Sequence, residues 1–190
     1  MLNPLRHPKR LCSWHGLILL LVAVTSLAAC SPDLDWREIR PKNIDILLTF
    51  PCKPQQITQD VQLAGKTVKM SMTGCATDDM TFALAHADMQ DRALVGPAMA
   101  ALHKAALQNV AGRVVRSQPA AVAHAAHGLP DALDLQITGK SPSGKPLRER
   151  VVLFAQGTQV FQMTTFAHVK RYKADAAQTF SNSVRLPAAD

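Results

Sequence analysis

The sequence lacks the short motifs by which common enzyme classes are recognised. It has no H-E-x-x-H pair for zinc, no G-x-S-x-G turn for a nucleophilic serine, and no glycine-rich phosphate loop ending in Lys-Ser or Lys-Thr. Aromatic residues make up only 5% of the chain, with a single tyrosine, and no helix rich in arginine is evident. These absences argue against nucleic-acid binding and against the familiar hydrolases. We therefore expect a non-catalytic protein that needs no metal and no cofactor.

The histidines and acidic pairs do not change this expectation. His124 and His127 are three residues apart, as two metal ligands on a helix would be, but the sequence offers no free cysteine and few acids beside them. His86 falls within an alternating strand pattern, where a packed or half-exposed side chain is expected. Asp78 and Asp79 form a polar tip of the kind that is usually solvated. None of these residues is predicted to be catalytic.

The chain also lacks an apolar run of about 20 residues, the length that a membrane-spanning helix needs. Its most apolar block, residues 16–29, follows Arg6, Lys9 and Arg10 and contains no charge. A positive segment, a short apolar segment and small residues, in that order, are typical of a secretory signal peptide. We expect residues 1–29 to be removed during export.

The end of this block resembles the lipobox of bacterial lipoproteins, in the tetrapeptide Leu27-Ala28-Ala29-Cys30. The resemblance implies that a diacylglycerol is attached to the Cys30 sulfur, that the chain is cut just before it, and that the new amino group is acylated. Several acyl chains anchor a protein stably, whereas one holds it only marginally. Ser31 implies sorting to the outer membrane, with the inner membrane as the alternative. The alternative is an ordinary cleaved signal with a chance cysteine.

Cleavage before Cys30 would leave 190 − 29 = 161 residues, enough for a single domain with a substantial core. Three of the 21 basic residues would be lost, so 18 would face 14 acids and the net charge would fall from +7 to +4. Only Lys170, Arg171 and Lys173 form a basic cluster, which we expect to be a solvated turn rather than a site for an anionic surface. Residues 30–43 are predicted to be a lipid-anchored linker and residues 44–190 the domain.

Two cysteines, Cys52 and Cys75, would remain besides Cys30. An even pair in an oxidising compartment predicts a disulfide. Closing a loop of about 24 residues would contribute roughly 3.4 kcal/mol in the chain-entropy model. A reactive thiol pair is the alternative, but there is no C-x-x-C spacing to support it.

Hydrophobic periodicity predicts mainly strands, with a helix in the middle of the chain and another at its end. The middle helix carries a buried stripe at Met99, Leu102, Ala106 and Val110. The predicted strands are 44–50, 57–63, 66–75, 80–89, 132–140, 147–155 and 158–168, and the predicted helices are 97–113 and 174–184. This order predicts an α+β fold, with an antiparallel sheet in meander order and both helices packed on one face.

Three segments, LLTFPCKPQ, LDLQITGKSPSGKPLRERVVLFAQGTQVFQMTT and TFSNSVRL, resemble uncharacterised proteobacterial lipoproteins. More distantly, they resemble the α/β/α sandwich of the PsbP-like proteins. The first group implies no biochemical activity. We therefore expect a membrane-anchored binding or scaffolding module that faces the periplasm and docks an envelope protein or polymer. The alternative is a small-ligand carrier or hydrolase whose site is built from residues distant in the sequence.

Overall fold

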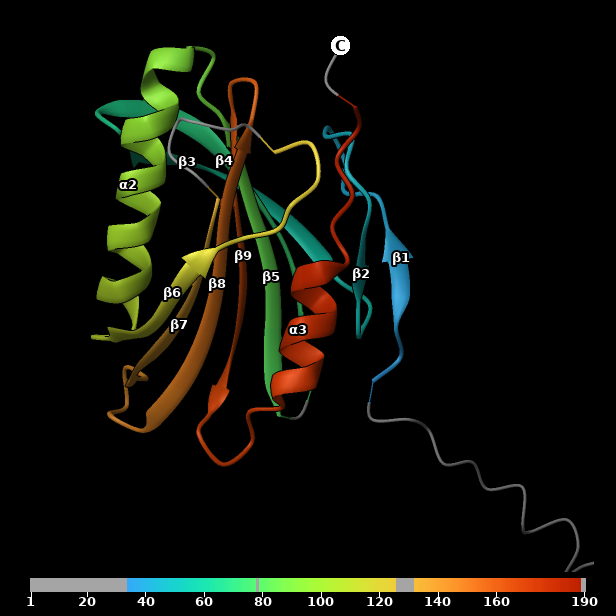
Figure 1. Cartoon of the computed structure of the whole chain (residues 1–190), viewed down its shortest axis with the longest axis vertical. Helices are drawn as coiled ribbons and strands as arrows, with labels where there is room; N and C mark the ends of the chain where they lie inside the picture. Colours follow the sequence, from blue (N-terminus) through green and yellow to red (C-terminus); the bar gives the residue numbers. More distant parts are fainter. Residues whose placement is uncertain (1–33, 78, 126–131, 189–190) are drawn as a thin grey trace, which may run out of the picture. The chain divides into compact units, whose positions relative to one another are not determined.

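The computed structural model describes residues 34–77, 79–125 and 132–188 (Figure 1). The domain is dominated by β-strands, with two helices, so it is α+β as predicted. The strands are β1 (Arg37–Ile39), β2 (Leu48–Phe50), β3 (Gln55–Leu63), β4 (Lys66–Ala76), β5 (Met80–Asp88), β6 (Arg113–Pro119), β7 (Leu133–Lys140), β8 (Pro146–Gln156) and β9 (Gln159–His168), and the helices are α2 (Arg92–Asn109) and α3 (Ala174–Asn182).

Seven strands form one antiparallel sheet in the order β3-β4-β5-β9-β8-β7-β6. Two meanders, β3 to β5 and β6 to β9, meet where β5 pairs with β9. The predicted meander order is therefore only partly right. After β5 the chain runs through α2 to the far edge of the sheet at β6 and then returns strand by strand.

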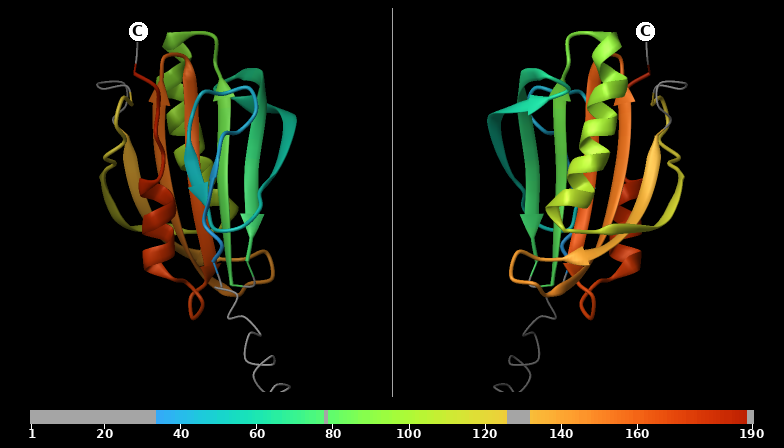
Figure 2. Two further views of the ribbon diagram at one scale, coloured as in Figure 1. Left: turned by 90° about the vertical axis from the view of Figure 1, so that its right-hand side faces the viewer. Right: turned by 90° about the vertical axis from the view of Figure 1, so that its left-hand side faces the viewer.

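The two helices cover opposite faces of the sheet (Figures 1 and 2). On β8, Val151 and Leu153 belong to the core beneath α2, whereas Val152 and Phe154 belong to the core beneath α3. Because side chains alternate along a strand, a central strand with two apolar sets must be covered on both sides. The prediction that both helices pack on one face was wrong.

A two-stranded ribbon, β1 and β2, lies beside α3 on the same face. Its Phe50 is fully buried and packs against Phe180 of α3, with ring centroids 5.0 Å apart. Leu34 and Trp36 also pack on this core, so part of the segment predicted as a linker, residues 30–43, is folded into the domain. The ribbon, and not only the helix, therefore completes this layer.

Three local features differ from the sequence prediction. The helix α2 begins at Arg92 instead of Pro97, because the Asp91 carboxylate accepts a hydrogen bond from the Ala93 amide (2.8 Å) and caps it there. It ends at Asn109, before Gly112. The edge strand β6 was not predicted, since most of its residues are exposed and lack an apolar alternation.

Candidate functional site

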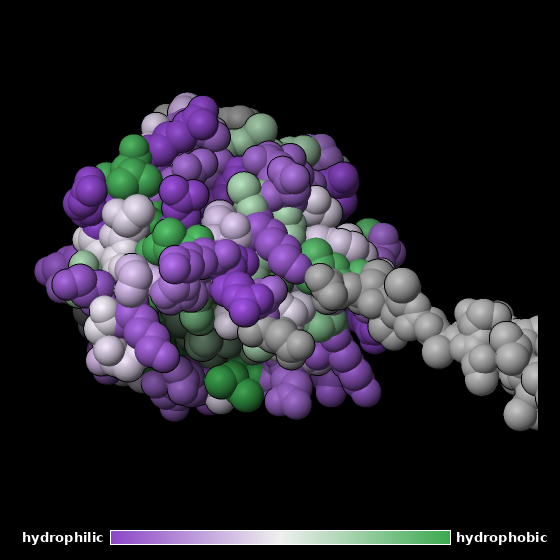
Figure 3. Space-filling model, turned by 90° about the horizontal axis from the view of Figure 1, so that it is seen from below, coloured by the Kyte–Doolittle hydropathy of each residue, from purple (hydrophilic) through white to green (hydrophobic). Residues whose placement is uncertain are grey.

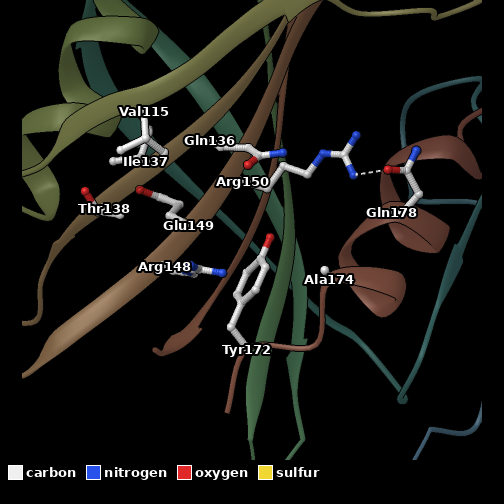
Figure 4. Close-up of a pocket in the computed structure, with 10 residues that line it drawn as sticks. All are labelled: Val115, Gln136, Ile137, Thr138, Arg148, Glu149, Arg150, Tyr172, Ala174 and Gln178. Carbon is white, nitrogen blue, oxygen red and sulfur yellow. Dashed lines mark hydrogen bonds between the residues drawn. The ribbon is translucent and has the colours of Figure 1, made fainter. Parts of the chain in front are cut away.

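Two hollows of about 300 Å³ each lie near β8, on opposite faces of the sheet. The first, which we call the Arg150 cleft, lies between the sheet and α3 (Figure 4). Its polar lining comes from seven side chains, of which Glu149 also lines the second hollow: Gln136, Thr138, Arg148, Glu149, Arg150, Tyr172 and Gln178. We call the second the Glu149 hollow. It lies on the α2 face, beside the C-terminal end of the helix.

The buried charges of the Arg150 cleft are already satisfied. The Arg150 guanidinium donates from Nε and Nη2 to the two carboxylate oxygens of Asp134, at 2.9 and 2.7 Å, and both side chains are less than 10% exposed. Its Nη1 donates to Gln178 Oε1 of α3 at 2.8 Å, and Gln118 Nε2 donates to Asp134 Oδ2 at 2.8 Å. A bidentate pair with these further bonds holds β6, β7, β8 and α3 together. We assign the pair a structural role.

Tyr172 points into the same cleft from the loop before α3 (Figure 4). Burial raises the pKa of its hydroxyl to about 12, and the nearby Arg150 opposes this shift only in part. The phenol is therefore neutral near pH 7. The exposed Arg148 is the remaining cation of the cleft.

The Glu149 hollow is of a different chemical kind. Apolar walls are provided by Met72, Ala83, Ala85, Leu147 and Phe166. Neutral polar groups come from Asn109, Ser141, Gln162 and Thr164, and Glu149 is the single titratable residue of the lining. The hollow lies where α2 ends at Asn109, and the segment that contains Ser141 and Pro142 forms another part of its wall.

Glu149 is held in this apolar setting by the strand register. It pairs with Ile137 on β7 and with Phe166 on β9, and it is only 6% exposed. Its Oε2 is buried without a hydrogen-bond partner among the described residues. Burial raises the pKa of the carboxyl from 4.5 to about 7. In Figure 4 this side chain lies on the other side of β8 from Arg150.

An unpaired buried carboxyl is costly, and such groups cluster at functional sites. Glu149 does not stand out in the sequence, because Arg148 and Arg150 flank it and the segment looks solvated. One signal was available: Glu149 shares the strand alternation of Val151 and Leu153, which are both buried.

The cysteines and histidines considered in the sequence lie in the packed structure of the domain where the structure describes them. Cys52 and Cys75 are joined by a disulfide (S–S 2.02 Å), which links the end of β2 to β4. His86 is buried and its ring stacks on Phe161, with centroids 6.2 Å apart, and burial lowers its pKa. His124 Nδ1 lies 3.1 Å from the Leu186 carbonyl oxygen. Cys30, His127 and Asp78 lie outside the described residues.

Neither a metal centre nor a membrane-spanning helix is found in the described part of the chain. No three His, Cys, Asp or Glu side chains come together there in a way that could hold an ion. Within the same residues, no helix is long and apolar enough to cross a bilayer.

The beginning of the domain lies at one end of the sheet, which we call the lower end (Figure 1). The Asp35 amide donates to the Pro51 carbonyl (2.9 Å), next to the Cys52–Cys75 bridge. The strand β4 ends here at Ala76, one residue after Cys75, and β7 and β9 also end here and lead into residues 141–145 and 169–173. Figure 3 views this end and shows mainly hydrophilic side chains around smaller hydrophobic areas.

Several lysines and arginines gather at the lower end. Arg171 and Lys173 lie 3.3 and 3.7 Å from the Asp79 carboxylate oxygens, so part of this charge is balanced. Val169 in the same loop is 39% exposed. The basic residues of the lower end include Lys53, Lys140, Lys145, Lys170, Arg171 and Lys173, and its described acids include Asp79, Asp175 and Asp35, the last paired with Arg37.

Comparison with known proteins gives little further information. No family model and no curated protein sequence matches the chain. Among solved structures it is similar to a protein of unknown function from Pseudomonas aeruginosa, with a TM-score of 0.47 and 12% identity, over 80% of this chain and 99% of that chain. A likeness at this level carries no argument about function.

Proposed function

We propose that this protein is a non-catalytic envelope lipoprotein, anchored through Cys30, whose domain faces the periplasm as a binding or scaffolding module. The signal-like residues 1–29 and the tetrapeptide ending at Cys30 support the anchor. The Glu149 hollow supports binding rather than catalysis, because its one titratable side chain has no second acid, base or activated nucleophile in the lining.

The observation that carries this proposal is the short distance along the chain from the anchor to the fold. The described domain begins at Leu34, four residues after Cys30, and Asp35 is already hydrogen-bonded to Pro51. Four fully extended residues span at most about 14 Å. A lipid on Cys30 would therefore keep the lower end of the domain close to the membrane surface.

The charge of the lower end favours the same orientation. A lysine or arginine near an anionic membrane surface contributes about 1 kcal/mol, within a Debye length. Lys170 lies in the loop that begins with the exposed Val169 and has no ion-pair partner among the described residues. The sequence also places Asp33 and Asp78 beside this end, so the attraction is modest and the acyl chains supply most of the anchoring.

Metabolic labelling with an alkyne fatty acid tests the anchor. The wild-type chain and Cys12→Ala should both be labelled, because Cys12 lies in the segment that is cleaved, whereas Cys30→Ala should carry no label. Cys12→Ala is the matched control for removal of a cysteine near the N-terminus. Equal labelling of Cys30→Ala and the wild type would overturn the proposal.

The second candidate function is that of a small-ligand carrier in the same compartment. One observation favours it, the unpaired carboxyl of Glu149 at an apolar hollow. A volume of about 300 Å³ lies at the lower limit of typical ligand sites, which range from about 300 to 1,000 Å³.

A further inference from the structure

The Glu149 hollow is electronegative as well as apolar. The helix α2 ends at Asn109 beside it, and the C-terminal end of a helix carries a partial negative charge. No lysine or arginine is present in the lining. The Glu149 carboxylate and the C-terminal end of α2 therefore both contribute negative potential to the hollow, and no lysine or arginine of its lining opposes them.

The position of the helix end is fixed closely. The Lys140 amide donates to the Val110 carbonyl oxygen at 2.7 Å, and a Cβ on Gly139 would collide with Val110. Glycine at this position lets α2 approach β7 closely. The wall of the hollow at Asn109 and Val110 is therefore held in place by backbone contacts between the end of α2 and β7.

The walls also suit an organic ligand better than a metal ion. Divalent cations such as Ca²⁺ and Mg²⁺ take six or more oxygen ligands, and here one carboxylate is surrounded by Met72, Leu147 and Phe166. Phe166 is 36% exposed at the rim, where its ring can meet a cation through its face. The small side chains of Ala83 and Ala85 leave room for an apolar group.

We propose that the Glu149 hollow binds a small organic cation, an ammonium group on a compact apolar body, with the ammonium hydrogen-bonded to the Glu149 carboxylate. The apolar body would lie against Met72, Ala83 and Ala85, and the hollow would exclude anionic ligands. This site is independent of the lipid anchor, so the inference stands or fails separately from the proposed anchoring.

A matched pair of probes tests the inference: benzylamine and benzyl alcohol have the same ring and differ in the cationic group. Their affinities would be measured by ligand-observed NMR at pH 8 with the full chain in a mild non-ionic detergent. Above the pKa of about 7, Glu149 is largely ionised. Because the ammonium of benzylamine would form a charged hydrogen bond to the Glu149 carboxylate, we expect benzylamine to bind about ten- to a hundredfold more tightly than benzyl alcohol.

Two variants make the test specific. Glu149→Gln should abolish the preference for the amine, because the amide keeps the shape of the side chain but not its charge. Ala85→Leu should weaken both probes, because the added carbons fill the hollow. Glu38→Gln, an exposed glutamate on β1, is the matched control and should behave as the wild type.

Several results would overturn the inference. They are equal binding of amine and alcohol by the wild type, a tighter binding of the alcohol, no binding of either probe, or an amine preference that survives Glu149→Gln. Loss of the preference in Glu149→Gln, with the wild-type preference retained in Glu38→Gln, would support it.

Discussion

Substitution of Glu149 by glutamine should change how the stability of the domain depends on pH. The pKa of the folded carboxyl is about 7, against an ordinary value of 4.5, and burial is the cause. Between these values the folded state keeps the proton that the unfolded state has released. Stability therefore falls as pH rises from about 4.5 through 7, and then levels off.

The size of the effect follows from the same two values. Their difference corresponds to about 3 kcal/mol, at about 1.4 kcal/mol for each pH unit. Glutamine resembles the protonated acid and cannot ionise, so Glu149→Gln should exceed the wild type by less than about 1 kcal/mol at pH 5 and by about 3 kcal/mol at pH 8. With an m-value of about 2 kcal/mol per molar urea, this shifts the midpoint by about 1.5 M.

The assay is a series of urea melts of the full chain in a mild detergent, at intervals from pH 5 to pH 8. Other titrating groups, including His86, are common to both proteins and cancel in the difference. Glu38→Gln, the same substitution at an exposed glutamate of β1, is the matched control and is melted over the same pH range. If the Glu149→Gln and wild-type midpoints differ by the same amount at pH 5 and pH 8, the folded state does not raise the pKa of Glu149.

Four further predictions concern the rest of the domain. Asp134→Ala should cost about 3–5 kcal/mol in a urea melt, because it leaves the buried Arg150 without its partner, and an unchanged midpoint would contradict the structural role of the pair. Phe180→Ala should cost about 3–5 kcal/mol, since the ring is fully buried against Phe50 and Phe82, whereas Asn182→Ala on the exposed side should stay within about 0.5 kcal/mol. Replacement of both Cys52 and Cys75 by alanine should lower the free energy of unfolding by about 3 kcal/mol, and no loss would show that the bridge does not constrain the unfolded chain. In anchored protein, a fluorophore at Lys170 should be quenched by spin-labelled lipid headgroups, whereas one at Arg92 at the other end of the sheet should not, and equal quenching would contradict the proposed orientation.

The strands and the two helices could largely be predicted from local pattern, because alternation and capping are short-range properties. The turns at Ala64-Gly65 and Gln156-Gly157 fall where expected, with both glycines at positive φ (78° and 61°). The edge strand β6 could not be predicted, since its pairing with β7 comes from the sheet and not from its own exposed residues.

The faces of the sheet and the candidate site required the structure. Sequence order does not say on which side a helix lies, and α2 and α3 cover opposite faces. Because helices cover both faces of the sheet, the neighbouring residues Glu149 and Arg150 are both buried, one on each face of β8. From the sequence, both side chains would be expected to be exposed to solvent. Arg150 is paired with Asp134, and Glu149 has no partner among the described residues. Both facts depend on how the strands are aligned with one another, which no local sequence pattern specifies.

The most direct measurement is the intact mass of the N-terminal peptide of the protein isolated from the cell envelope. We expect a mature chain that begins at Cys30 and carries a diacylglyceryl group on the cysteine sulfur and a further acyl chain on its amino group. A chain that begins at another residue, or one with an unmodified Cys30, would contradict this expectation.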